Sequence, residues 1–272
     1  MGADPVTVKL DKLIGLVSPS RLETAQVCMA KFCFRYIERE PEPWNAAMQF
    51  GTAFDETVGH CFTAKKATRL PTIKRAQEMF ASEWDYAAGA IEVWQGEQRG
   101  ALLDIGVKCV AAWQPRIGRH IKPLAVQEHL TEQVKDPISG DTFALQGFLD
   151  IRGTRRTVDI VADTKTSKKA YSQSVFQKRM QPVSYTLLTG LNTFEYHVVT
   201  RTKKPAVQVL RATITDDDRR GFLIRAGILR RNIAHAYRTG DWLPNRDSNL
   251  CSKRYCAFWS KCEARFGGSV PA

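Results

Sequence analysis

Two aspartates and a lysine on neighbouring apolar segments have the residue types and spacing for metal-dependent chemistry. Asp150 and Asp163 each end an apolar run, and Lys165 follows two residues later. Because strand side chains alternate between faces, Asp163 and Lys165 project to the same side, with Thr164 opposite. If the two segments pair as a hairpin through residues 153–156, Asp150 lies beside that face. A purely structural ion pair between Lys165 and Asp163 at the end of a strand would give the same pattern.

This grouping favours phosphodiester hydrolysis. Paired carboxylates make a hard oxygen site for Mg²⁺ or Mn²⁺. A neighbouring lysine can orient a water and offset charge that develops on a phosphorus centre. The next predicted helix adds Gln181 and Tyr185, whose i, i+4 spacing puts them on one face. Ordinary helix packing with a polar edge would give the same pair.

These residues must be positioned by a mixed set of helices and strands. Apolar periodicity predicts helices over residues 18–37, from 47 past 60, 74–119 with a break at 89–100, 172–191 and 216–237. Short β-branched runs predict strands over residues 124–134, 143–151, 157–163, 194–200 and 206–214. This order predicts one α/β domain over residues 1–272, with a helical part (1–120), a catalytic core (121–214) and a C-terminal helix and cysteine segment (215–272).

Composition sets the broad class of the protein. The 272 residues carry 40 Lys and Arg against 28 Asp and Glu, a net charge of +12, with 43% hydrophobic residues. That hydrophobicity argues against global disorder. We expect no membrane span and no signal peptide, and hence a cytoplasmic protein. The excess of basic residues favours nucleic acid as the partner, although an anionic membrane surface would attract the same positive charge.

Three short motifs resemble RecB-type nucleases of the PD-(D/E)XK superfamily, which include CRISPR-associated adaptation exonucleases and phage exonucleases. The motifs are Gly147-Phe-Leu-Asp150, Asp163-Thr-Lys165-Thr166 and Gln181-x-x-x-Tyr185, and the resemblance extends from Ser18 to Cys262. It implies a restriction-endonuclease-like mixed sheet flanked by helices. It also implies a Mg²⁺- or Mn²⁺-dependent DNA exonuclease that acts on single strands or ends. Recombination, repair, phage replication and CRISPR adaptation, with their partner proteins, use such enzymes.

The resemblance also implies a role for each matching residue. Asp150 and Asp163 would be metal ligands, with the Thr164 carbonyl as a third. Lys165 would be the catalytic lysine, while Gln181 and Tyr185 would steady that lysine and the DNA. The resemblance adds Glu128, on the preceding strand, as an acidic residue of the metal site.

One position departs from the family pattern. The family shows Gly-x-x-x-His on an early helix, whereas Asp55 follows Gly51 here. A carboxylate can bind Mg²⁺ directly, so we expect Asp55 in the site. His60 is the rival, but it lies five residues further on and faces another direction. The departure keeps open an alternative, a DNA-binding or adaptation-complex subunit whose nuclease site is weak or lost.

Three of the seven cysteines, Cys251, Cys256 and Cys262, lie within twelve residues. Such a group selects a soft centre, either zinc or iron–sulfur. Zinc sites more often show Cys-x-x-Cys knuckles, and the spacings here are Cys-x4-Cys and Cys-x5-Cys. A third hypothesis, beside the nuclease and the DNA-binding subunit, is therefore a basic zinc-binding module without catalytic activity.

The family resemblance supplies a fourth cysteine. Cys28 matches an early family cysteine that joins three C-terminal ones around a [4Fe–4S] cluster. The cluster would then tie the N-terminal and C-terminal segments together. Cys33 is the competing ligand, and we expect Cys61 and Cys109 to be free and buried.

Basic and aromatic residues near the carboxylate strands are candidate DNA contacts. The basic set is Arg152, Arg155, Arg156, Lys168 and Lys169. Contacts of this kind hold phosphates without reading sequence and depend strongly on salt. Trp94, Trp113, Tyr171 and Phe176 would stack on bases if they were exposed, although a core position is expected for each.

Overall fold

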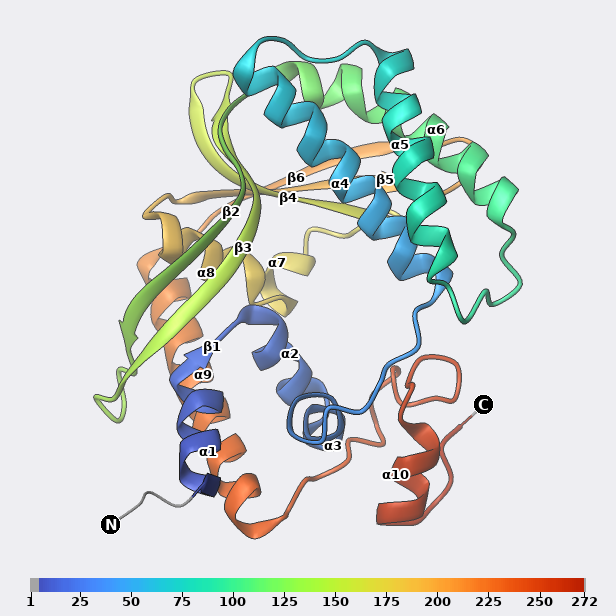
Figure 1. The fold of residues 1–272 in the computed structure, drawn as a ribbon. Coiled ribbons are helices and arrows are strands. Elements are labelled where there is room, and N and C mark those ends of the chain that lie inside the picture. The colour runs from blue at the N-terminus through green and yellow to red at the C-terminus, as the bar shows by residue number, and fades with distance from the viewer. Residues whose placement is uncertain (1–4, 272) are drawn as a thin grey trace.

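The computed structural model describes residues 5–271, and Figure 1 shows their arrangement. The helices are α1 (Pro5–Gly15), α2 (Pro19–Val27), α3 (Met29–Phe32), α4 (Ala46–Ala67), α5 (Ile73–Gly89), α6 (Arg99–Arg116), α7 (Val175–Lys178), α8 (Gln181–Thr189), α9 (Asp216–Thr239) and α10 (Trp259–Phe266). A π-helical turn spans Cys33–Ile37, and a 3-10 turn spans Gly118–His120. The strands are β1 (Leu16–Val17), β2 (Ile121–Lys135), β3 (Thr142–Arg155), β4 (Val158–Ser167), β5 (Thr193–Thr200) and β6 (Val207–Thr213).

The strands form one mixed sheet. Its order is β1-β3-β4-β5-β6, and β2 pairs with β3 off this path. The β2–β3, β3–β4 and β5–β6 pairs are antiparallel, whereas β4 and β5 are parallel and are joined by the crossover through α7 and α8. The expected α/β fold, a mixed sheet flanked by helices, is confirmed.

Helices pack on both faces of the sheet and bury a core on each. One core joins strand residues such as Phe194 and Tyr196 to Leu188 of α8 and Phe222 of α9. The other core lies under α4, α5 and α6, which Figure 1 shows gathered on one side of the strands. None of the helices described over residues 5–271 is both long enough and apolar enough to cross a membrane.

Two predicted helices are each broken, for local reasons. The helix expected over residues 18–37 is interrupted at Cys28, whose φ of −165° is extended and whose Sγ accepts the Lys31 N–H at 3.4 Å as the N-cap of α3. The helix expected over residues 172–191 splits at Arg179, which has an extended backbone. Pro182 lies in the first turn of α8, where proline marks a helix start rather than an interior.

Candidate active site

The site forms where strands β3 and β4 separate. Their antiparallel ladder runs from the hairpin turn to the Ile151–Ala162 pair and stops there, so Asp150 and Asp163 are the next residues on either side. β4 continues beside β5, while the Thr164 N–H, which lacks a β3 partner, donates to Asp150 Oδ2 at 2.6 Å. We call this point the carboxylate fork.

Asp55 of α4 joins the fork from the face of the sheet that α4, α5 and α6 cover. Its carboxyl group is hydrogen-bonded to Asp150, and burial together with the nearby charge of Asp163 raises the pKa of Asp55 to about 6. Burial and the charges of Asp163 and Asp55 also raise the pKa of Asp150 well above its ordinary value. The rival residue, His60, lies elsewhere, with Nδ1 3.4 Å from Glu83 on α5.

Lys165 completes the charged group. Its Nζ lies 2.5 Å from Asp163 Oδ2, as expected for two residues on one side of β4. Loss of solvation alone would lower the pKa of Lys165, but the charges of Asp163 and Asp150 raise it above its ordinary value. The ammonium therefore stays charged, and 37% of the side chain is exposed to reach a ligand.

Helix α8 supplies a polar support behind the fork. Gln181 Nε2 donates to Asp163 Oδ1 at 2.6 Å and to Tyr185 Oη at 3.0 Å, while the Tyr185 hydroxyl donates to the Phe148 carbonyl at 2.6 Å. Burial and the charge of Asp163 raise the pKa of Tyr185, which keeps the hydroxyl a donor. Tyr196 of β5, which the sequence did not single out, donates to Gln181 Oε1 at 3.3 Å.

Gly147 allows α8 to approach β3 this closely. A Cβ placed on Gly147 would lie 2.7 Å from Leu188 Cδ1 and 2.9 Å from Tyr185 Cε1. We predict that Gly147→Val lowers the free energy of unfolding by about 1–3 kcal/mol, because overpacking displaces both side chains. Urea unfolding measures this, with Gly221→Val as a control, since no atom lies within 4 Å of that Cβ position. Equal stability of the two variants would contradict the packing described.

An open cleft of about 470 Å³ leads to this group. It is lined by Ser18, Pro19, Ser20, Glu23, Gln146, Gly147, Phe148, Lys165, Tyr171, Arg179, Gln181, Tyr185 and Tyr196. Glu23 of α2 binds Arg179 at 3.1 Å and accepts the Met180 N–H at 2.7 Å, so it ties α2 to the start of α8 across the cleft. Neither Glu23 nor Arg179 lies in a sequence pattern that would identify it.

The donor set at the fork fits a hard divalent cation. Three carboxyl groups face one ammonium, and Asp55 and Asp150 can hydrogen-bond to each other only while one of them holds a proton. A divalent cation would replace that proton, with the carboxylate oxygens as the ligands that Mg²⁺ and Mn²⁺ prefer. As the side chains are placed, no three His, Cys, Asp or Glu residues in the described part of the chain form a group that could hold a metal ion.

Glu128, expected in the metal site, is engaged elsewhere. Its two oxygens accept hydrogen bonds from Arg152 Nε and Nη2 at 3.0 and 2.8 Å. This bidentate pair also occupies Arg152, which was expected to contact DNA. In this structure both side chains are therefore engaged in an ion pair between β2 and β3, and their roles in metal and DNA binding stay predictions.

The other expected DNA contacts are scattered. Arg155 lies 3.4 Å from the buried Glu195, and Lys168 lies 2.7 Å from Glu97. Arg156 sits at the hairpin turn, six residues along the chain from Asp150 or about 20 Å of extended strand, beside exposed Lys66, Arg119 and Lys122. Lys169 is exposed near the end of β4. The structure does not gather these five basic residues at the fork.

Arg155 belongs to a structural network around Glu195. Burial alone would raise the pKa of Glu195, but His197 at 2.8 Å, Arg211 and Arg155 lower it to about 2. A carboxylate with a lowered folded-state pKa stabilises the fold above its ordinary pKa, and this stabilisation is lost as the pH falls from about 4.5 towards 2.

We predict that Glu195→Gln lowers the free energy of unfolding at neutral pH by about 1–3 kcal/mol, because the side chains around the buried Glu195 lose a charged hydrogen-bond acceptor. The variant should also lose less stability than the wild type between pH 4.5 and 2. Urea unfolding across that range measures both effects, with exposed Glu132→Gln as the control. If the free energy of unfolding changed with pH in the same way in the wild type and both variants, this network would be contradicted.

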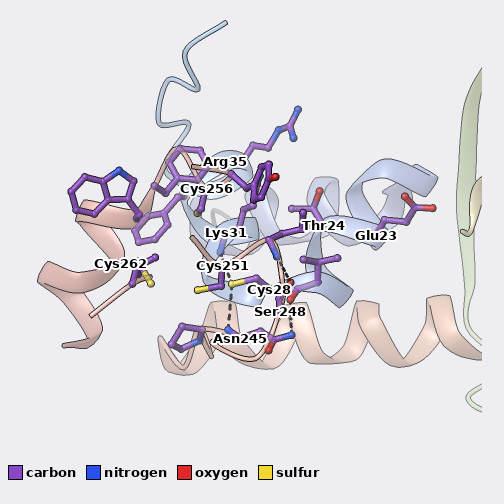
Figure 2. A pocket seen from close by; sticks show the side chains of 18 of the residues that line it. Glu23, Thr24, Cys28, Lys31, Arg35, Asn245, Ser248, Cys251, Cys256 and Cys262 are labelled. Carbon is purple, nitrogen blue, oxygen red and sulfur yellow. Dashed lines mark hydrogen bonds between the residues drawn. The ribbon is translucent and has the colours of Figure 1, made fainter. Parts of the chain in front are cut away.

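The four predicted cluster cysteines line one pocket of about 260 Å³, although Cys28 is far in sequence from the other three. Figure 2 shows Cys28, Cys251, Cys256 and Cys262 around this pocket, between α3 and the C-terminal segment. Cys28 Sγ accepts the backbone N–H groups of Lys31 and Asn245 at 3.4 and 3.5 Å. The fold thus brings one cysteine of the N-terminal part and three of the C-terminal segment to one pocket, although as placed over residues 5–271 their thiols do not form a group that could hold a metal ion.

The remaining cysteines face away from that pocket. Cys33 Sγ donates to Glu38 at 3.4 Å, and burial raises the pKa of this thiol to about 12. Cys61 and Cys109 are free and buried, as expected, and burial raises their pKa values to about 11 and 12. Of the two early candidates, Cys28 is the one that joins the C-terminal cysteines.

A mixed sheet flanked by helices, with two aspartates and a lysine at a strand fork, defines a restriction-endonuclease-like nuclease fold. The sequence model of the PD-(D/E)XK nuclease superfamily matches residues 16–263, and the chain belongs to that superfamily.

Solved structures are similar to this chain at low sequence identity. One is the "Putative exonuclease" from Eubacterium rectale, with 13% identity, a TM-score of 0.52 and 100% of this chain and 96% of that chain covered. Another is named SSO0001, with 12% identity, a TM-score of 0.43 and 96% and 94% covered. The search of curated proteins found no match.

Proposed function

We propose that this chain is a Mg²⁺- or Mn²⁺-dependent deoxyribonuclease that acts as an exonuclease on single-stranded DNA or DNA ends. One observation carries the proposal: Asp55, Asp150, Asp163 and Lys165 meet at the carboxylate fork, beside an open cleft. Three carboxyl groups that share a single ammonium are a costly arrangement, of the kind that functional sites retain for chemistry. The net charge of +12 suits a polyanionic substrate.

The cation would be held by Asp150 and Asp163, with Asp55 in the place of the usual histidine and the Thr164 carbonyl as a further oxygen. A divalent cation bound there polarises the scissile phosphate and lowers the pKa of a bound water. The Thr164 N–H fixes the direction of the Asp150 carboxylate. A hydrogen bond from Gln181 fixes the direction of the Asp163 carboxylate.

Lys165 would act on the phosphate itself. Its ammonium is permanently charged beside Asp163 and partly exposed, so it can approach the phosphate and stabilise negative charge in the transition state. Gln181 holds the aspartate that positions this lysine, and Tyr185 accepts a hydrogen bond from the same Gln181 amide. They would be positioning residues rather than groups that exchange protons with the substrate.

We further propose that Cys28, Cys251, Cys256 and Cys262 hold a [4Fe–4S] cluster with a structural role. The four thiols line one pocket, and N–H groups already point at the Cys28 sulfur, as suits a thiolate ligand. Burial raises the pKa values of Cys256 and Cys262, while Lys31 and Arg246 act in the opposite direction. The cluster would join the start of α3 to α10 and to the segment before it.

The exonuclease character and the cellular setting are part of the same proposal. The Eubacterium rectale structure is named "Putative exonuclease", and the fold is shared with it. A cytoplasmic role in recombination, repair, phage replication or CRISPR adaptation, with proteins of those processes as partners, follows from the motif resemblance.

Linear and circular substrates test the exonuclease proposal. Purified protein is incubated with Mn²⁺ and end-labelled linear single strands, linear duplex, or covalently closed circular single strands, with EDTA controls. We expect mononucleotides or short products from the linear substrates and none from the circle. Cleavage of the circle at the same rate would show an endonuclease instead.

A further inference from the structure

Phe148 is an aromatic side chain left exposed on β3 beside the carboxylate fork. It is 66% exposed, although its strand neighbours Gly147 and Leu149 are buried. Alternation along the strand puts Phe148 on the same side of β3 as Asp150, about 7 Å further along. A ring exposed at this place is accessible to a ligand that enters the fork.

His129 holds this ring in a fixed plane. The two residues are directly paired across β2 and β3. Their rings are stacked, with centroids 4.3 Å apart and an interplanar angle of 12°. His129 Nε2 is held in turn by Gln146 Oε1 at 3.2 Å. The stack covers one face of the Phe148 ring and leaves the rest of it for a planar partner.

The same residue is part of the cleft that leads to the fork. Phe148 lines this cleft with Lys165, and its carbonyl accepts the Tyr185 hydroxyl at 2.6 Å. The base of a nucleotide lies several ångströms from its phosphate, which is of the same order as the roughly 7 Å between the Phe148 and Asp150 positions on β3. Every base has a π-face, so stacking on an exposed aromatic ring is tolerant of sequence.

From this geometry we propose that the Phe148 ring, backed by His129, is a stacking site for a nucleobase of the DNA strand engaged at the fork. The inference rests on the proposed function, because it takes DNA as the ligand. It adds a contact that recognises the base rather than the phosphate. It also favours unpaired nucleotides, since a base inside a duplex has both faces covered by its neighbours.

The test compares the affinity of Phe148→Ala, Phe148→Trp and the wild type for two short probes in EDTA. One probe is a single-stranded oligonucleotide, and the other has the same length with every nucleotide abasic. We expect Phe148→Ala to bind the base-containing probe about 5- to 100-fold more weakly than the wild type, and Phe148→Trp to restore binding. The abasic probe should bind all three proteins equally. Leu124→Ala, at an equally exposed apolar residue of β2 (60%), is the control and should match the wild type.

The outcomes separate this inference from the proposed function. Equal affinity of Phe148→Ala and the wild type for the base-containing probe would overturn the stacking site, as would an equal loss on both probes. Binding is measured without metal, so a protein that binds but never cleaves DNA would refute the nuclease proposal alone. A wild type that binds neither probe would refute both.

Discussion

Replacing Asp163 by Asn should abolish DNA cleavage while leaving the fold and DNA affinity largely intact. Asn keeps the shape of the side chain and can still bond Gln181, but it removes the charge that faces Lys165 and the proposed cation. We expect a rate loss of about 10³-fold or more, beyond the roughly 10²–10³ that one electrostatic donor supplies. Single-turnover cleavage of labelled single strands measures it. Lys165→Ala should abolish cleavage in the same assay.

Asp159→Asn is the matched control for that experiment. Asp159 is exposed on the same strand and accepts a hydrogen bond from Thr154, away from the fork. Its variant should cleave at the wild-type rate. Undiminished turnover by Asp163→Asn or Lys165→Ala would show that the catalytic group lies elsewhere.

Replacing Cys256 by Ser should remove the proposed iron–sulfur cluster and destabilise the protein. Loss of a link between α3 and the C-terminal segment should cost about 2–5 kcal/mol, by comparison with disulfides that join distant segments. Protein purified without oxygen should be brown, and the variant should lose the visible absorbance and unfold at lower urea concentration. Iron and sulfide analysis gives the cluster content directly.

Cys33→Ser is the control for the cluster, because Cys33 lies near α3 but donates to Glu38 instead of lining the pocket. It should keep the colour and the iron content. A colourless wild type with stoichiometric zinc would contradict the iron–sulfur assignment and leave the four cysteines as a zinc site.

The fork residues could be predicted because their signals are local. Asp150 and Asp163 each end an apolar run, and alternation along a strand is enough to place Lys165 beside Asp163. The helices α4, α5 and α9 follow from apolar periodicity in the same way. Asp55 could be located only through its motif, because no pattern in the neighbouring residues indicates that α4 packs beside the fork.

The supporting residues could not be predicted, because they depend on pairings between distant segments. Tyr196 reaches Gln181 through the parallel register of β4 and β5. Arg155 looked like a free DNA contact because its partner, Glu195, lies forty residues away. The break at Cys28 was missed for a similar reason. A helical pattern does not reveal a cysteine that caps one helix and faces a distant segment.

Hydrolysis of DNA at the carboxylate fork with a divalent cation is tested most directly by the rate of nucleotide release from linear single-stranded DNA. Mn²⁺ is added stepwise to protein stripped with EDTA. We expect no release without metal, a saturable rise with Mn²⁺, and a flat response in Asp163→Asn. A wild-type protein that binds the DNA but releases nothing at any Mn²⁺ concentration would contradict it and favour a DNA-binding subunit with a lost nuclease site.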